Sequence, residues 1–172
     1  VIRTARSLGY RTVAVYSDAD SDARHVALAD EAVCIGPATV SQSYLNADAI
    51  LAAAQQTGAD AVHPGYGFLS ENSTFAQACE AAGITFIGPP VNAIHLMGSK
   101  RLSKIAMQEA GVPCIPGYEG ADQSDATLIS EAERIGLPLM IKASAGGGGR
   151  GMRVVTNMAE VAEQLRSARA EA

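Results

Sequence analysis

Strand-like and helix-like segments alternate along the first half of the chain, and this order most constrains the fold. The strand-like segments are short and apolar, whereas the segments between them show helical spacing and end at glycines. Parallel strands need long crossover connections, which helices usually provide. The alternation therefore predicts an α/β fold with a doubly wound parallel sheet. The expected strands are 11–17, 31–35, 59–63 and 84–88, and the expected helices are 46–58 and 73–83.

The pattern changes after Pro89 and Pro90. Two strands, 137–144 and 151–156, are joined by a short loop, which favours an antiparallel pair. We therefore predict a Rossmann-like domain over residues 1–97, without its first strand, and the beginning of an α+β domain over 98–172. The other expected elements of this second domain are helices at 91–97, 100–110, 125–136 and from Asn157 onward, and a strand at 112–116.

Composition excludes several classes of protein. Hydrophobic residues make up 48% of the 172 residues, and the net charge of −5 argues against a nucleic-acid coat or a polybasic membrane surface. The sequence has no apolar run near the length of a membrane-spanning helix. Cys34, Cys79 and Cys114 are widely spaced and form no CxxC pair, so we expect three buried thiols in a reducing, cytoplasmic compartment. Both ends of the chain have helical spacing, so we expect a segment of a longer polypeptide.

Five glycines fall within the six residues from Gly146 to Gly151. Each glycine costs about 0.5–1 kcal/mol relative to alanine in an ordered element, so the loop needs a role that requires bare backbone. The GxGxxG spacing is followed by a strand rather than a helix, which excludes a dinucleotide fingerprint, and no GK[ST] is present for a Walker A loop. A kinase glycine loop precedes its lysine, whereas Lys142 comes before this loop.

Two lysines accompany the glycine-rich loop. Lys142 lies in an otherwise apolar strand three residues before the loop, where it either extends to solvent or contacts a phosphate. Lys100 follows Ser99, a candidate N-cap, and an anion at the helix start would offset the unfavourable dipole there. The alternative for Lys100 is a solvated basic turn.

The strand, Lys142, the glycine hairpin and the second strand together resemble the nucleotide-binding lobe of the ATP-grasp superfamily. Within that superfamily the whole chain resembles biotin carboxylase, despite Ala145 where another glycine is expected. The segments that carry the resemblance are HPGYGFLSEN at 63–72, IGPP at 87–90, LMGSK at 96–100 and GVPCIPG at 111–117.

The resemblance implies the ligands and their residues. Lys100 and Lys142 would contact ATP phosphates, the backbone of Gly147, Gly148 and Gly149 would form a mobile lid over them, and Met152 would pack near the adenine. ATP would activate bicarbonate as carboxyphosphate, with Mg²⁺ present, and the carboxyl group would pass to carrier-bound biotin. The family's catalytic residues and Mg²⁺ ligands lie beyond this chain, so we name none here and expect the segment alone to be inactive.

The resemblance also implies partners and a location. These are a biotin carboxyl carrier domain, a carboxyltransferase that selects the acyl-CoA, and further copies of the chain, in the cytoplasm or in the mitochondrial matrix of a eukaryote. Two alternatives remain open: another ATP-grasp ligase, such as a carbamoyl-phosphate synthetase or a purine-pathway carboxylase, and a non-catalytic nucleotide-binding or assembly module. His63 and Glu71 are either acid–base groups or residues that fix their loop, with Asn72 or Ser73 capping the next helix.

Overall fold

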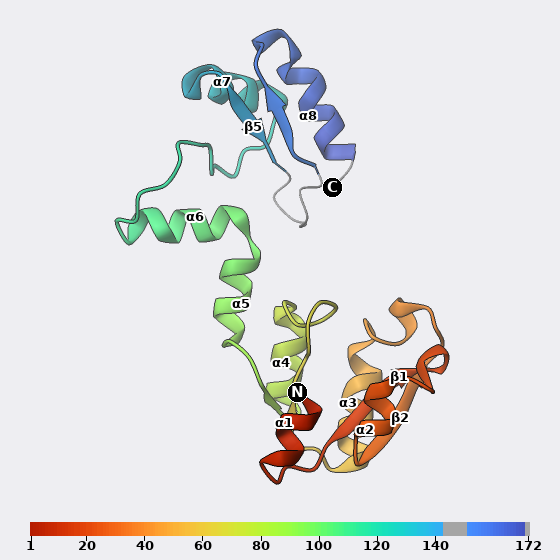
Figure 1. Ribbon diagram of the computed structural model, residues 1–172. Helices are drawn as coiled ribbons and strands as arrows, with labels where there is room; N and C mark the ends of the chain where they lie inside the picture. The colour runs from red at the N-terminus through yellow and green to blue at the C-terminus, as the bar shows by residue number, and fades with distance from the viewer. Residues whose placement is uncertain (143–150, 171–172) are drawn as a thin grey trace. The chain divides into compact units, whose positions relative to one another are not determined.

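The computed structural model describes residues 1–142 and 151–170 and divides the chain into two compact units (Figure 1). The first unit is Val1–His95 and the second is Leu96–Ala172. The first unit has two strand pairs and the second has one, and each unit has its own buried cluster.

Two parallel strand pairs form the sheet layer of the first unit. β1 (Val13–Ser17) pairs with β2 (Glu31–Gly36), and β3 (Ala61–Val62) pairs with β4 (Thr85–Phe86). The parallel pairing confirms the sequence prediction, although the strands are hydrogen-bonded as two pairs rather than as one continuous sheet. The unit's helical elements are α1 (Ile2–Ser7), η1 (Asp18–Asp20), α2 (Arg24–Leu28), η2 (Val40–Gln42), α3 (Ala47–Thr57) and α4 (Ser73–Ala81), and α5 (Val91–Gly98) begins within it.

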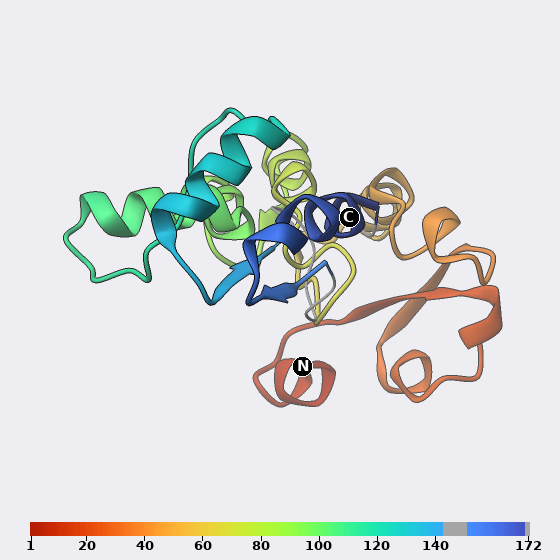
Figure 2. The same ribbon diagram turned by 90° about the horizontal axis from the view of Figure 1, so that it is seen from above.

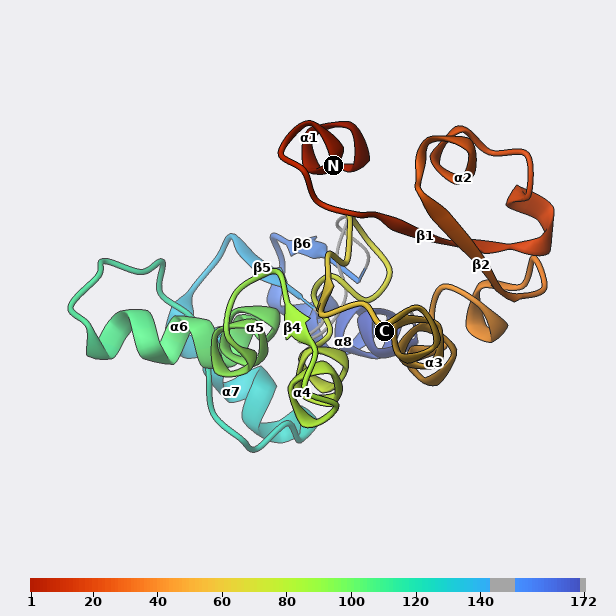
Figure 3. The same cartoon turned by 90° about the horizontal axis from the view of Figure 1, so that it is seen from below.

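Helices cover both faces of the first strand pair. Figure 2 and Figure 3 show α2 on one side of β1 and β2 and α3 on the other, which is the doubly wound arrangement. α3 starts where Asn46 Oδ1 accepts a hydrogen bond from the Ala49 amide at 3.1 Å, and it ends at Gly58, which has a left-handed φ of 65°. The capping residues therefore set the helix at the length that the sequence pattern predicts.

The core of the first unit lies among α3, α4 and the second strand pair. Phe75 on α4 is 2% exposed and meets Phe86 on β4 edge to face, with ring centroids 6.1 Å apart. The buried members of this cluster are Ala54, Leu69, Phe75, Cys79 and Ile84. Because Leu69 belongs to the loop after β3, the core also fixes part of that loop.

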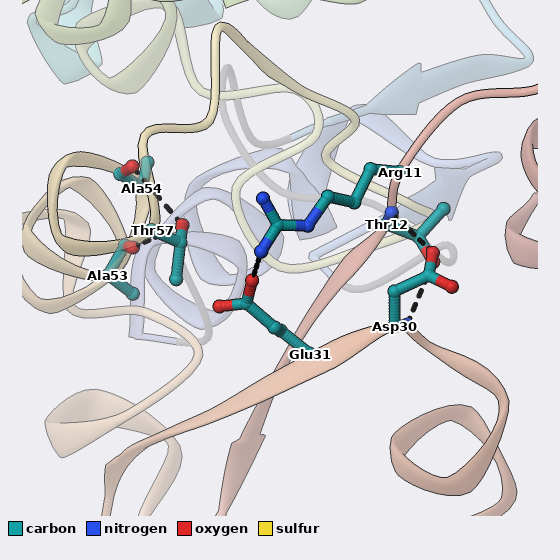
Figure 4. A network of polar contacts seen from close by, with 7 residues as sticks. All are labelled: Arg11, Thr12, Asp30, Glu31, Ala53, Ala54 and Thr57. Carbon is teal, nitrogen blue, oxygen red and sulfur yellow. Dashed lines mark hydrogen bonds and ion pairs between the residues drawn. The ribbon is translucent and has the colours of Figure 1, made fainter.

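Polar contacts join the start of β1 to the start of β2 (Figure 4). The Thr12 amide and hydroxyl both donate to Asp30 Oδ2 at 2.8 Å, and the Arg11 guanidinium pairs with the Glu31 carboxylate. In the same view Thr57 donates to the Ala53 carbonyl of α3. These contacts hold the register in which Val13 faces Glu31.

The Asp30 contact predicts acid sensitivity. The bonds from the Thr12 hydroxyl and then its amide lower the pKa of Asp30 below the ordinary value of 3.8. The ionised carboxylate therefore contributes stability above pH 3.8, and the contribution is lost as pH falls through the folded-state pKa. We expect Asp30→Asn, which cannot titrate, to show a smaller loss of stability than the wild type between about pH 5 and pH 3. Urea midpoints measured by circular dichroism across that range test this, and equal losses in both proteins would contradict it.

The second unit is an antiparallel hairpin covered by helices. β5 (Leu139–Ile141) pairs with β6 (Arg153–Val155), with Leu139 opposite Val155 and Ile141 opposite Arg153, which confirms the predicted antiparallel pair. Figure 3 shows α7 (Asp125–Ile135) and α8 (Val161–Ala170) on one side of the strands. The buried cluster between them is Ala132, Val155, Val161 and Leu165. The other helical elements are α6 (Lys100–Glu109) and η3 (Met158–Glu160).

Two sequence predictions were wrong. Residues 112–116 form no strand, because Pro113 and Pro116 lack the amide hydrogens that a ladder needs. The three thiols are not all buried: Cys34 on β2 is exposed and Cys114 is half-buried, whereas burial raises the pKa of Cys79 in the core. Among the described residues, no helix has both the length and the apolar character needed to cross a membrane.

Candidate functional site

The first part of the candidate site is the loop 63–72, which leaves the carboxyl end of β3 and enters α4. The Gly65 amide donates to His63 Nδ1 at 3.1 Å, so His63 fixes the backbone of its own loop. At the other end, Asn72 Oδ1 accepts from the Phe75 amide at 2.8 Å and caps α4. Of the two interpretations considered for His63, the structure favours the loop-fixing one, and the predicted capping role of Asn72 is confirmed.

The middle of this loop presents aromatic rings to solvent. Tyr66 is fully exposed, and Phe68 is 58% exposed. Gly65 and Gly67 have positive φ, and Phe68, at φ 44°, is the one non-glycine residue with positive φ in the described parts of the chain. Residues other than glycine rarely adopt a positive φ, so the contacts around Phe68 must hold its backbone in this conformation.

A partly buried hydrogen-bond network lies at the carboxyl end of β1. The Tyr44 hydroxyl donates to Asp20 Oδ2 at 2.5 Å and accepts from the Ser17 amide at 2.9 Å, and the Ser17 hydroxyl donates to the same carboxylate oxygen at 2.9 Å. The bond from Tyr44, followed by that from Ser17, lowers the pKa of Asp20. Burial and the bond to Asp20 raise the pKa of Tyr44, so the hydroxyl stays protonated as the donor.

Sequence reasoning missed Tyr44 as part of this site. Its partners lie in β1 and η1, far from it in the sequence, and no local spacing announces them. The available signal was the place of Asp20 just after a predicted strand, where parallel sheets gather polar groups at one edge.

The second part of the candidate site belongs to the second unit. Ser99 Oγ accepts from the Leu102 amide at 3.2 Å, which confirms the predicted N-cap of α6. Lys100 is therefore the first residue of α6, and its side chain is exposed. On the next turn, Lys104 Nζ lies 2.5 Å from Glu119 Oε1, and Arg101 donates to the Glu119 carbonyl, so these contacts hold α6 to the following loop.

The hairpin brings two predicted residues to the same end. Lys142 directly follows β5 with an exposed side chain, and Met152 directly precedes β6 and is half-buried. Because Ile141 pairs with Arg153, the next positions outward are Lys142 and Met152. Lys142 thus stands just beyond the apolar strand in which the sequence placed it. Gly147, Gly148 and Gly149, and with them the proposed lid, lie outside the described residues.

A surface depression of about 630 Å³ lies elsewhere on the first unit, between α4 and the start of α5. It contains none of the predicted site residues, and its lining includes Ser73, Gln77, Glu80 and His95. Across residues 1–142 and 151–170, no three His, Cys, Asp or Glu side chains gather where they could hold a metal ion.

The family model described as the biotin carboxylase N-terminal domain matches residues 1–94, more than half of the chain. The chain belongs to the biotin carboxylase family. A second model, the ATP-binding domain of the carbamoyl-phosphate synthase L chain, matches residues 99–172.

Relatives from the family match over the whole length of this chain. It is 55% identical to a biotin carboxylase of Haemophilus influenzae, covering all of this chain and 39% of that protein. It is also 55% identical to a mitochondrial methylcrotonoyl-CoA carboxylase subunit alpha of Dictyostelium discoideum, covering 25% of that protein. The chain thus spans well under half the length of these curated relatives.

Solved structures of the family share the fold. A biotin carboxylase complex with β-γ-ATP from Campylobacter jejuni matches 99% of the chain and 38% of its own length, at TM-score 0.93 and 49% identity. The biotin carboxylase domain of the Hydrogenobacter thermophilus 2-oxoglutarate carboxylase, in complex with MgADP, ADP and bicarbonate, matches 99% of the chain and 37% of its own length, at TM-score 0.93 and 48% identity.

Proposed function

We propose that the protein carrying this chain uses ATP and bicarbonate to carboxylate biotin. The observation that carries the proposal is the 55% identity to a biotin carboxylase over the whole of this chain. The hairpin of the chain ends at Lys142 and Met152. The neighbouring structures bound to ATP-type ligands and bicarbonate support the same substrates. We infer a Rossmann-like domain over residues 1–97 and the beginning of the ATP-grasp domain over residues 98–172.

We infer that residues of the second unit contact the nucleotide. Lys100 and Lys142 are exposed cations, which suits them to phosphate oxygens, and the half-buried Met152 offers an apolar surface for the adenine. Gly147, Gly148 and Gly149 provide backbone amides for the phosphates. Mg²⁺ neutralises charge on the transferring phosphoryl group and takes carboxylate oxygens as ligands. By the family resemblance, we infer that its ligands come from outside this chain.

The proposed partners extend beyond this chain. Bicarbonate would be activated as carboxyphosphate, and biotin would arrive on a carrier domain and leave for a carboxyltransferase. We infer a homo-oligomer in the cytoplasm, or in the mitochondrial matrix of a eukaryote, as for the mitochondrial relative.

Isotope transfer tests the proposed function. With the complete protein that carries this chain, labelled bicarbonate should become acid-labile carboxybiotin only when ATP, Mg²⁺ and free biotin are all present. Omitting biotin should abolish label transfer, and omitting ATP should abolish it equally. ADP release that depends on ammonia instead of biotin would contradict the proposal and favour a carbamoyl-phosphate synthetase.

A further inference from the structure

Two aromatic rings join the loop 63–72 to a distant part of the first unit. The rings of Tyr44 and Phe68 are stacked, with centroids 5.2 Å apart and planes inclined by 19°. Tyr44 follows η2, whereas Phe68 lies in the exposed middle of the loop after β3. The stack is therefore a long-range tertiary contact on a loop that projects toward solvent.

Hydrogen bonds to the Tyr44 hydroxyl, at the tip of the side chain, restrict the position of the ring. The hydroxyl donates to Asp20 and accepts from the amide of Ser17, the last residue of β1. Ser17 is 1% exposed, so the anchor is part of the packed interior. A hydroxyl held by two bonds in this way cannot follow the side chain to another χ1 rotamer without breaking both of them.

The loop itself needs such a support. Leu69 anchors one side of it in the core, and the contact between His63 and Gly65 fixes its start. Phe68 stands between these points with a φ of 44°, a conformation that a phenylalanine keeps only when its surroundings enforce it. The stacked Tyr44 ring contacts Phe68 at this point of the loop, two residues from the fully exposed Tyr66.

We propose that Tyr44 is a positioning residue that holds the loop 63–72 through Phe68 and thereby sets affinity for the acceptor substrates, bicarbonate and biotin, rather than for ATP. The substrate assignment rests on the proposed function. The loop leaves the carboxyl end of a parallel strand, the edge at which open α/β sheets place ligands. The residues proposed for ATP, Lys100, Lys142 and Met152, all belong to the other unit.

Variants of the complete protein separate the ring from the hydroxyl. Tyr44→Leu removes both the stack and the hydrogen bonds, Tyr44→Phe keeps the stack, and Phe68→Leu removes the stack while leaving Asp20 and Ser17 untouched. Tyr10→Leu is the matched control, because Tyr10 is an exposed tyrosine of the same unit. If the two rings act together, the double variant Tyr44→Leu/Phe68→Leu should be no worse than the more damaging single variant.

Two measurements test the proposal separately from the proposed function. Hydrogen exchange of peptides covering 63–72 should be faster in Tyr44→Leu and Phe68→Leu, intermediate in Tyr44→Phe, which keeps the ring but loses its anchor, and unchanged in Tyr10→Leu. In steady-state assays, Tyr44→Leu should raise the KM for free biotin or bicarbonate about fivefold or more, while the KM for ATP stays within about twofold. Tyr44→Phe, which keeps the stacked ring without its hydrogen bonds, should show a smaller rise than Tyr44→Leu.

Three results would overturn the proposal. Unchanged loop exchange in Tyr44→Leu would show that the stack does not hold the loop, whether or not the protein is a biotin carboxylase. An equal rise in the KM for ATP would show a general loss of structure, and unchanged KM values for both acceptors would show that the loop does not serve them. A wild-type protein without biotin-dependent activity would instead refute the proposed function, and the exchange experiment would still decide the role of Tyr44.

Discussion

Replacing Lys142 with alanine should weaken the use of ATP by about 10- to 150-fold in kcat/KM, while the KM for free biotin stays close to wild type. A hydrogen bond to a charged group contributes about 1.5–3 kcal/mol, and each 1.4 kcal/mol is about a factor of ten. Lys142 is exposed just after β5, shortly before the glycine-rich segment, so its truncation removes a cation without opening the core. Steady-state kinetics with ATP and biotin varied in turn give both constants.

Met140→Ala is the matched control for this substitution. Met140 lies on the same strand with its side chain 45% exposed, and its truncation removes a similar length of side chain but no charge. It should leave the constants for ATP near wild type. If Met140→Ala and Lys142→Ala weakened ATP use equally, the effect would come from the strand and not from the ammonium group, and Lys142 would lose its place in the site.

Replacing Phe75 with alanine should destabilise the first unit by about 3–5 kcal/mol, the largest effect on folding that we expect from a single substitution here. Its side chain is 2% exposed and packs against Phe86 and the cluster around Cys79, so truncation leaves a cavity. Tyr10→Ala, an exposed aromatic of the same unit, should change stability by no more than about 0.5 kcal/mol. Urea unfolding followed by circular dichroism measures both.

The location of the Phe75→Ala effect matters as much as its size. The second unit has its own core of Ala132, Val155, Val161 and Leu165, which contains no residue of the first. Amide protection in α7 and α8 should therefore persist under conditions where α3 and α4 of the variant already exchange rapidly. Simultaneous loss of protection in both units would show that they unfold as one body.

Local chemistry explains why much of the fold was predictable. Asn46, Asn72 and Ser99 each precede a segment of helical spacing, and each accepts the amide bond that an N-cap requires. The strand predicted at 112–116 was wrong because its apolar side chains suggest a strand, whereas Pro113 and Pro116 lack the amide hydrogens on which a strand depends. Val112 is 46% and Ile115 84% exposed, so the apolar pattern of this segment indicated neither a strand nor burial.

The candidate site was predictable only where its signal is local. Lys142 and Met152 flank a glycine-rich segment and are found by reading along the chain, and the hairpin register then places them at one end. The Tyr44 network joins three separate segments, and the φ of Phe68 follows from the fold around it. Such contacts arise from the tertiary arrangement, so no sequence window contains them.

The unequal burial of the cysteines makes this protein suitable for site-selective dye labelling. Cys34 is exposed in the first unit and Cys114 is half-buried in the second, whereas Cys79 is enclosed in the core with a raised pKa that suppresses its thiolate. A maleimide fluorophore should therefore attach first at Cys34 and next at Cys114. A donor and acceptor pair on those two thiols would report, by energy transfer during turnover, whether nucleotide binding changes the separation of the units.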